Sequence, residues 1–264
     1  MANGGANSVR VIEGQKSLLG RTMHAIAYDP IHDEFTVPQE FGQAILTFRG
    51  AATGEEPPVR VIQGPLTRIQ DVSRLDVDFV NNEIFVPQDD EVLVFPREGN
   101  GNVAPVRVIK GPDTQLGAAA VGIDTVHNLL VVAGQQRRVG ARLLVFDRAA
   151  SGNAKPKASI GGPKSGFKSL GGPFAVYGPK GEIIVSVRGV GGTEENPLMS
   201  SEDCFVGVWS VTDNGDVPPH YVIGGPNGVL RMVRGVALDP KNKSIIVSDK
   251  RLNAVMTFYF PEMF

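Results

Sequence analysis

Four charged residues stand where the repeated pattern of this chain breaks, and they are of the types that bind anions and move protons. His24 could act as a general base, and Arg74 and Arg234 could stabilise a developing negative charge. Asp76 occupies a position at which the aligned copies have Ala, Gly or Val, and a carboxylate in such a crowded place is costly unless it is paired. The four residues therefore predict either a pocket for a charged ligand or for catalysis, or a salt-bridge network that satisfies itself.

The sequence carries little other chemistry. Only one of the four histidines, His24, belongs to this group. No set of metal ligands therefore assembles, and we predict neither a metal nor a cofactor. A nucleophile elbow, a P-loop and a dinucleotide fingerprint are all absent from the sequence. The single cysteine, Cys204, comes just before a predicted strand, which favours a small buried side chain over a nucleophile.

The composition excludes several classes of function. The 26 Lys and Arg residues nearly balance the 28 Asp and Glu residues, so the chain lacks the basic excess that holds nucleic acid. No apolar run reaches the length of a membrane span, and the first residues lack the apolar stretch of a signal peptide. We expect a soluble protein that is either cytoplasmic or exported with its signal peptide removed, and the sequence leaves both alternatives open.

An internal repeat accounts for the high content of 32 Gly and 19 Pro residues among 264. Each full repeat has an aromatic residue, a Gly six residues later, a Pro four residues after that Gly, and an Ile 14 residues after the aromatic. A Gly and a Pro at fixed spacing predict a tight turn between two paired strands. The isoleucines, which recur at intervals of 50, 47, 51 and 63 residues, are Ile12, Ile62, Ile109, Ile160 and Ile223.

Each repeat contains four short apolar runs separated by turn residues, which is typical of one blade of a β-propeller. Five repeats predict an all-β fold, a five-bladed β-propeller of four-stranded antiparallel blades, formed as a single domain over residues 1–264. The chain begins with an isolated strand at residues 9–12 and ends with three strands. We therefore expect the N-terminal strand to pair with the last three strands, at 235–238, 244–247 and 255–258, and to close the ring.

Four segments resemble the NHL-type propeller repeat and its bacterial relatives. They are IleAlaTyrAspPro at 26–30, AsnAsnGluIlePheValPro at 81–87, ValLeuValPhePro at 92–96 and AsnValAlaProValArgValIle at 102–109. The resemblance covers nearly the whole chain and implies a propeller, although most NHL domains have six blades. It leaves the activity open, because such relatives include hydrolases, lyases and binding platforms. The axial metal ligands that the lactonase- and lyase-type relatives draw from several blades have no matching set in this sequence.

The predicted strand order places two kinds of loop at opposite ends of the blades. One kind is short and carries a recurring Asp, at Asp29, Asp78, Asp124 and Asp239, which predicts Asx turns. The other kind varies in length, and variable loops on a rigid scaffold commonly carry function. Its longest member is an insertion at about residues 188–204, and its other charged stretches are 40–43, 89–91, 135–138 and 249–251.

We predict that the face formed by these variable loops binds a protein partner or a small ligand, without nucleic acid or membrane insertion. The sequence favours a non-enzymatic scaffold, because no catalytic set accompanies the charged loops. The alternative is a small-molecule hydrolase or lyase that uses the four charged residues at the mouth of the propeller channel. The residues expected at the binding face are His24, Arg74, Asp76, Arg137, Arg138, Arg188, Glu194, Glu195 and Arg234.

Overall fold

A computed structural model of the chain describes residues 4–5, 7–21, 23–136, 140–170, 172–187, 204–225 and 228–264. Its contacts divide into two compact units. The first unit comprises Met1–Ile84 and Phe95–Val106, and the second comprises Phe85–Val94 and Arg107–Phe264. The expectation of a single domain over residues 1–264 stays a prediction.

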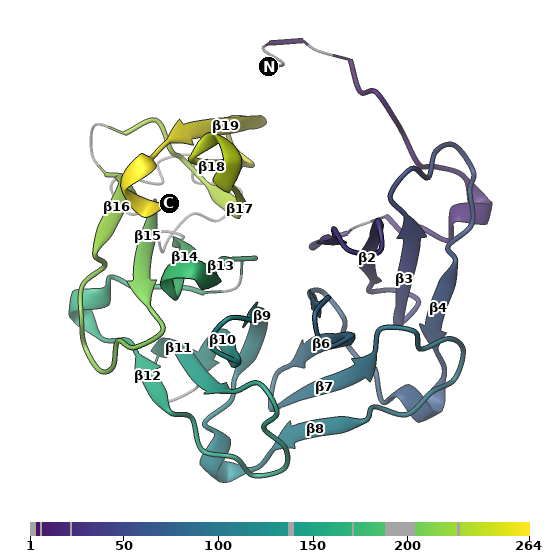
Figure 1. Cartoon of the computed structure of the whole chain (residues 1–264), viewed down its shortest axis with the longest axis horizontal. Coiled ribbons are helices and arrows are strands. Elements are labelled where there is room, and N and C mark those ends of the chain that lie inside the picture. The colour runs from purple at the N-terminus through teal and green to yellow at the C-terminus, as the bar shows by residue number, and fades with distance from the viewer. Residues whose placement is uncertain are drawn as a thin grey trace, which may run out of the picture. The chain divides into compact units, whose positions relative to one another are not determined.

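Consecutive strands lie side by side in each sheet (Figure 1). The first sheet contains β1 (Ala27–Asp29), β2 (Glu34–Gln39), β3 (Ala44–Arg49) and β4 (Arg60–Gln63). The second contains β5 (Asp76–Asp78), β6 (Glu83–Gln88), β7 (Glu91–Pro96) and β8 (Arg107–Lys110). The third contains β9 (Ala118–Asp124), β10 (Leu129–Gln136), β11 (Gly140–Asp147) and β12 (Ala158–Ile160).

The last two sheets follow the same order. The fourth contains β13 (Ala175–Tyr177), β14 (Glu182–Val187), β15 (Phe205–Ser210) and β16 (Tyr221–Gly224). The fifth contains three strands, β17 (Val233–Asp239), β18 (Ser244–Asp249) and β19 (Ala254–Tyr259). Single 3-10 turns connect the strands: η1 (Gln15–Ser17), η2 (Pro65–Thr67), η3 (Pro112–Thr114), η4 (Pro163–Ser165), η5 (Gly178–Lys180), η7 (Pro240–Asn242) and η8 (Pro261–Met263).

The aromatic residue of each repeat lies in the core. Phe48, Phe95, Phe146 and Trp209 are fully buried, each on the third strand of its sheet. The flanking strands β6 and β14 are buried on both faces, so they read as continuous apolar runs. Burial of these rings and of the Val, Ile and Leu residues around them supplies the main driving force for each blade.

The glycines six residues after each repeat aromatic reverse the chain and also contact the preceding repeat; they are Gly54, Gly101, Gly152 and Gly215. Their positive φ angles, between 62° and 84°, confirm the predicted tight turns. Each of these glycines forms a parallel bridge with the repeat isoleucine of the repeat before it. Residue spacing within one repeat carries no signal for this second role, because the two partners of each bridge belong to different repeats. The four bridged pairs are Ile12 with Gly54, Ile62 with Gly101, Ile109 with Gly152, and Ile160 with Gly215.

The predicted closing strand at residues 9–12 contacts the turn of the first sheet. Within the described residues the last sheet has three strands, and Ile12 makes only an isolated bridge. The carbonyl of Val11 accepts from Gly54 N at 2.7 Å, and Glu13 N donates to Gly54 O at 3.0 Å. Val61 and Gln63 of β4 make the same two contacts with Gly101 while β4 also pairs with β3, so these bonds use one edge of the strand only. Residues 9–12 and the last sheet belong to different units, and the pairing between them stays a prediction.

The described regular structure consists of antiparallel sheets and single 3-10 turns. This confirms the predicted all-β fold class, a five-bladed β-propeller. Among the described residues, none belongs to a helix with the length and apolar character needed to cross a bilayer.

Candidate functional site

The four charged residues predicted to form a site lie in both units, and each is described within its own. In the first unit, His24 Nδ1 lies 3.3 Å from Glu40 Oε2, and both side chains are partly exposed. Asp76 opens β5 and accepts a hydrogen bond from the backbone of Val77 at 2.9 Å. Arg74 and Asp76 each have at least one further interaction.

In the second unit, Arg234 belongs to β17. Its Nη2 lies 3.9 Å from the sulfur of Met232, and its buried Nε has no hydrogen-bond partner among the described residues. The grouping of Arg234 with the three residues of the first unit stays a prediction, and so does the hydrolase or lyase that would depend on it.

The short, repetitive loops are Asx turns, as predicted. The carboxylate of Asp29 accepts from the backbone of Ile31 at 2.9 Å and of His32 at 3.1 Å, and it also binds His32 Nδ1 at 2.7 Å. Asp124 holds His127 in the same way. These histidines therefore serve turn geometry. Among the described residues, no three His, Cys, Asp or Glu side chains come together as a metal site would require.

The variable-loop face of the second unit is organised by Asp249 at the end of β18. One carboxylate oxygen accepts from the backbone of Arg231 at 2.7 Å and of Met232 at 2.9 Å. The other accepts from Arg251 and Leu252, both at 3.0 Å. A single buried side chain thus fixes two connections, the β18–β19 loop and the segment that enters β17.

These contacts also decide the ionisation of Asp249. Burial alone would raise its pKa, but the four backbone N–H donors outweigh burial and hold the pKa below its usual value. Asp249 is therefore a carboxylate at neutral pH. We call Asp249 and its four backbone hydrogen bonds the Asp249 bracket. The charge of Asp249 lies inside this bracket, and the neighbouring basic side chains, Lys250 and Arg251, are exposed.

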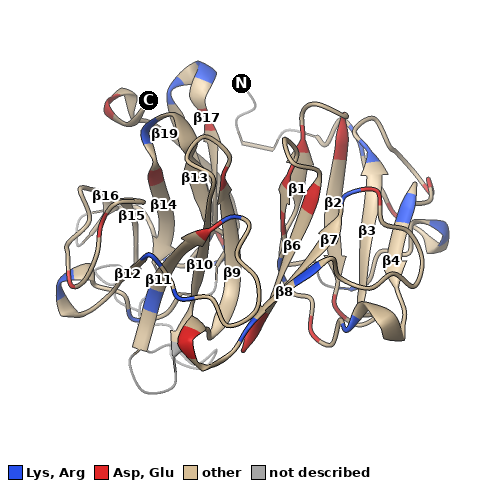
Figure 2. Cartoon of the chain, turned by 60° about the horizontal axis from the view of Figure 1, so that its bottom comes forward, with Lys and Arg blue, Asp and Glu red and all other residues tan. Residues whose placement is uncertain are grey.

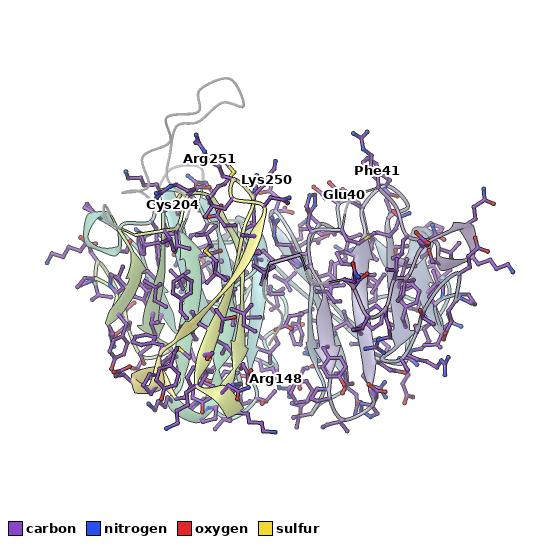
Figure 3. All side chains as sticks on the ribbon, turned by 90° about the horizontal axis from the view of Figure 1, so that it is seen from above. Glu40, Phe41, Arg148, Cys204, Lys250 and Arg251 are labelled. Atoms are coloured by element: carbon purple, nitrogen blue, oxygen red, sulfur yellow. The ribbon has the colours of Figure 1, made fainter. Side chains whose placement is uncertain are left out.

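Two adjacent basic residues, Lys250 and Arg251, project from this bracket and are exposed. In Figure 3 they lie at one end of the second unit together with Cys204, and Arg148 lies at the opposite end. That separation confirms, for this unit, that variable loops and short turns occupy opposite ends of the sheets. Exposed apolar side chains accompany the basic pair, with Leu252 at 43% exposure and Val229 at 54%. We call Val229, Lys250, Arg251 and Leu252 the last-blade patch.

The prediction for Cys204 is confirmed. The residue is fully buried, and its thiol lies 3.0 Å from the backbone oxygen of Arg231. It therefore helps to hold the same entry segment as Asp249. The predicted site residues Arg137, Arg138, Arg188, Glu194 and Glu195, together with the insertion up to residue 203, lie outside the described residues.

The variable loop of the first sheet offers a different surface. Gln39 Oε1 accepts from Gly42 N at 2.5 Å and braces the loop. Phe41 is 71% exposed, beside Glu40, and Figure 3 shows both residues at the tip of the first unit's strands. This loop was predicted to contribute to the binding face only through its charge, and the exposed aromatic ring of Phe41 was not predicted.

Both charge signs are spread over each unit. Figure 2 shows the positions of Lys and Arg (blue) and of Asp and Glu (red) interspersed along strands and loops. Local groups such as the last-blade patch must therefore provide any charge selectivity, since the formal net charge of the chain is only −2.

Comparison with known proteins supports the fold and leaves the activity open. No family model matches the chain, and no curated protein matches it. Among solved structures, the Kuenenia stuttgartiensis hydrazine synthase is similar, with a TM-score of 0.63 and 15% sequence identity. The match covers 91% of this chain and 65% of that chain, so this chain spans less than two thirds of its neighbour's length. At this identity the likeness concerns the propeller fold alone.

Proposed function

We propose that the protein is a non-enzymatic scaffold that binds a protein partner through its variable-loop face, and that the last-blade patch is the centre of binding in the second unit. The observation that carries the proposal is the set of four backbone hydrogen bonds to the Asp249 carboxylate. These bonds fix the loop from which the side chains of Lys250 and Arg251 extend into solvent. A rigid loop loses little conformational entropy on binding.

The chemistry of the patch indicates the kind of partner. The two exposed cations are followed in the chain by the exposed Leu252, and the exposed Val229 comes two residues before Arg231, whose backbone Asp249 holds. Such a surface suits an acidic protein segment that also carries an apolar anchor, because charge steers the encounter and apolar burial holds the complex. The resemblance to NHL-type repeats agrees with this role, since binding platforms occur among those relatives. Membership of that family is part of the proposal.

The test is a double charge reversal, Lys250→Glu with Arg251→Glu. We expect it to reduce association with the partner at least tenfold, because opposite charges at the interface become like charges. Partners of the native chain would be identified by cross-linking and mass spectrometry. The affinity of each purified partner would then be measured by calorimetry for native and variant chains.

The matched control is Lys241→Glu with Lys243→Glu, a charge change of the same size on exposed residues of the same sheet, at its short-turn end. This control should bind like the native chain. Equal binding by the native chain and the Lys250/Arg251 variant would refute the proposal, and so would equal losses in both double variants.

A further inference from the structure

Two of the four turn glycines, the glycines six residues after the repeat aromatics, directly follow an asparagine. An Asn-Gly pair is chemically labile, because glycine has no side chain to obstruct the attack of its backbone nitrogen on the preceding side-chain amide. Both asparagines are exposed to water. The two pairs are Asn100–Gly101 and Asn214–Gly215, whereas Thr53 and Ser151 precede the other two turn glycines.

In the first unit, one residue of the preceding repeat holds both reacting groups of the Asn100–Gly101 pair. Asn100 Oδ1 accepts a hydrogen bond from Val61 N at 2.9 Å, and Gly101 N donates one to Val61 O at 2.6 Å. For the attack, Gly101 N must lose its proton and approach Asn100 Cγ. Both hydrogen bonds oppose that movement, so the folded junction protects the pair.

The second unit builds the same arrangement from different residues. Asn214 Oδ1 accepts from Ser159 N at 2.9 Å, and Gly215 N donates to Ser159 O at 2.8 Å. Protection is therefore a property of the junction between two repeats and does not depend on one local sequence. The junctions at Thr53 and Ser151 keep the Ile–Gly bridge but have no side-chain amide at this position.

We propose that Asn100 and Asn214 are latent modification sites, which deamidate when the junction that holds them opens. The glycine nitrogen forms a bond to the asparagine Cγ, and the side-chain amide nitrogen leaves as ammonia together with the proton of the glycine nitrogen. Water then adds to one of the two carbonyl carbons of the cyclic imide and opens it. The products are aspartate and isoaspartate, and water is the only other reactant.

Modification would change the junction permanently. Isoaspartate inserts one additional carbon atom into the backbone before the turn glycine, so the glycine is displaced relative to the strand that it bridges. Either product also adds a negative charge next to the hydrogen bonds described above. We therefore expect a junction that has opened and reacted to close less tightly than before, so that each modified asparagine records an opening of the junction.

The first experiment compares the folded and unfolded chain. The purified protein is incubated in mildly alkaline buffer with and without urea, and peptides from both samples are mapped by mass spectrometry after chromatographic separation of isoaspartate. We expect Asn100 and Asn214 to react at least about tenfold more slowly in the folded chain, because only opened junctions react. Equal rates in the folded and unfolded chain would overturn the proposal.

The second experiment loosens one junction at a time. Asn102→Ala removes the acceptor of Leu66 N, a 2.8 Å bond beside Asn100, and Asp216→Ala removes the acceptor of Lys164 N, a 2.7 Å bond beside Asn214. Asn102→Ala should speed the reaction of Asn100 about fivefold and leave Asn214 unchanged, and Asp216→Ala should do the converse.

Each variant is the matched control for the other. Every rate is divided by the rate of the same variant in urea, which removes any effect of the new neighbour on the chemistry itself. A general loss of stability would speed both asparagines alike. Acceleration of both sites by either variant, or of neither site, would therefore overturn the proposal.

Discussion

Glu34 and Glu182 each begin the second strand of a sheet, but they meet different neighbours. Glu34 Oε2 forms ion pairs with Arg60 and with Arg97, the latter at 2.7 Å. Arg60 comes from the fourth strand of the same sheet, and Arg97 follows the aromatic position of the next repeat. The carboxylate is thus neutralised by cations from two consecutive repeats.

In the fourth sheet, aromatic rings replace both of those arginines. Tyr221 stands at the position of Arg60, and Phe260 stands two residues after Phe258 as Arg97 stands after Phe95; their rings meet edge to face at 5.2 Å. Glu182 remains, with its Oε2 buried and without a hydrogen bond among the described residues. Burial raises the pKa of Glu182, and the nearby Lys180 and His220 only partly oppose this.

We predict that Glu182→Gln stabilises the protein slightly at pH 8, by about 0.5 kcal/mol or less, because the substitution removes a poorly solvated charge that water still partly screens. The folded-state pKa of Glu182 is raised, so its contribution to stability is present below the unfolded-state pKa and is lost as pH rises through the folded-state value. The gain of the variant should therefore disappear near pH 4. Urea denaturation at the two pH values measures it.

The matched substitution Glu34→Gln should act in the opposite direction. It leaves two guanidinium groups without their shared carboxylate, so a loss of about 2 kcal/mol is expected at pH 8. If both variants change the free energy of unfolding with the same sign, the proposed difference between the paired Glu34 and the poorly solvated Glu182 is contradicted.

At the scale of elements, the same two contacts join consecutive repeats at several places, and we call each such pair of contacts a clasp. After three of the four turn glycines, the next residue accepts a hydrogen bond from the 3-10 turn that follows the preceding repeat. Asn102 Oδ1 binds Leu66 N at 2.8 Å, Asn153 Oδ1 binds Asp113 N at 2.8 Å, and Asp216 Oδ1 binds Lys164 N at 2.7 Å. The Ile–Gly bridge and this side-chain bond together join one repeat to the next.

Two glycines at one clasp should differ in how much an alanine substitution costs. Gly101 has φ of 78° and open space where a Cβ would be, so Gly101→Ala should cost about 1 kcal/mol from backbone strain alone. Gly64 has φ of 128°, and its Cβ would lie 2.6 Å from Asn102 Oδ1. Gly64→Ala should therefore cost more, by about 1 kcal/mol or more, since its φ of 128° and ψ of 171° form a backbone conformation almost restricted to glycine and the Cβ also breaks the Asn102 bond. Equal losses for both variants in denaturant melts would contradict the clasp.

Sequence spacing predicted the elements well because it reports local structure. A Gly and a Pro at fixed distances from an aromatic residue specify a turn within one repeat, and the buried Phe95 and the positive φ of Gly101 agree. The clasp was missed because its partners, such as Leu66 and Asn102, are 36 residues apart. The bracket around Asp249 was missed for the same reason, since a loop read for its charge does not reveal which backbone groups it holds.

At the scale of the whole molecule, closure of the ring by the N-terminal strand stays a prediction. Residues 9–12 have the ValArgValIle sequence of residues 59–62 and 106–109, and the contacts of Val11 and Glu13 with Gly54 match those of Val61 and Gln63 with Gly101. Deleting residues 1–14 should therefore sharply lower the midpoint temperature of unfolding in calorimetric scans, because the edge of the last sheet would lose its neighbour. An unchanged midpoint would contradict closure.

The clasp between repeats has a consequence for how such a chain can grow. Each junction is encoded half in one repeat, by its isoleucine and the glycine after it, and half in the next, by a turn glycine and the polar residue that follows. Because these halves are nearly the same at successive junctions, copies behave as interchangeable modules. Duplicating or deleting one whole repeat would join compatible ends without inventing a new interface, so blade number can change by genetic duplication while the junction chemistry is conserved.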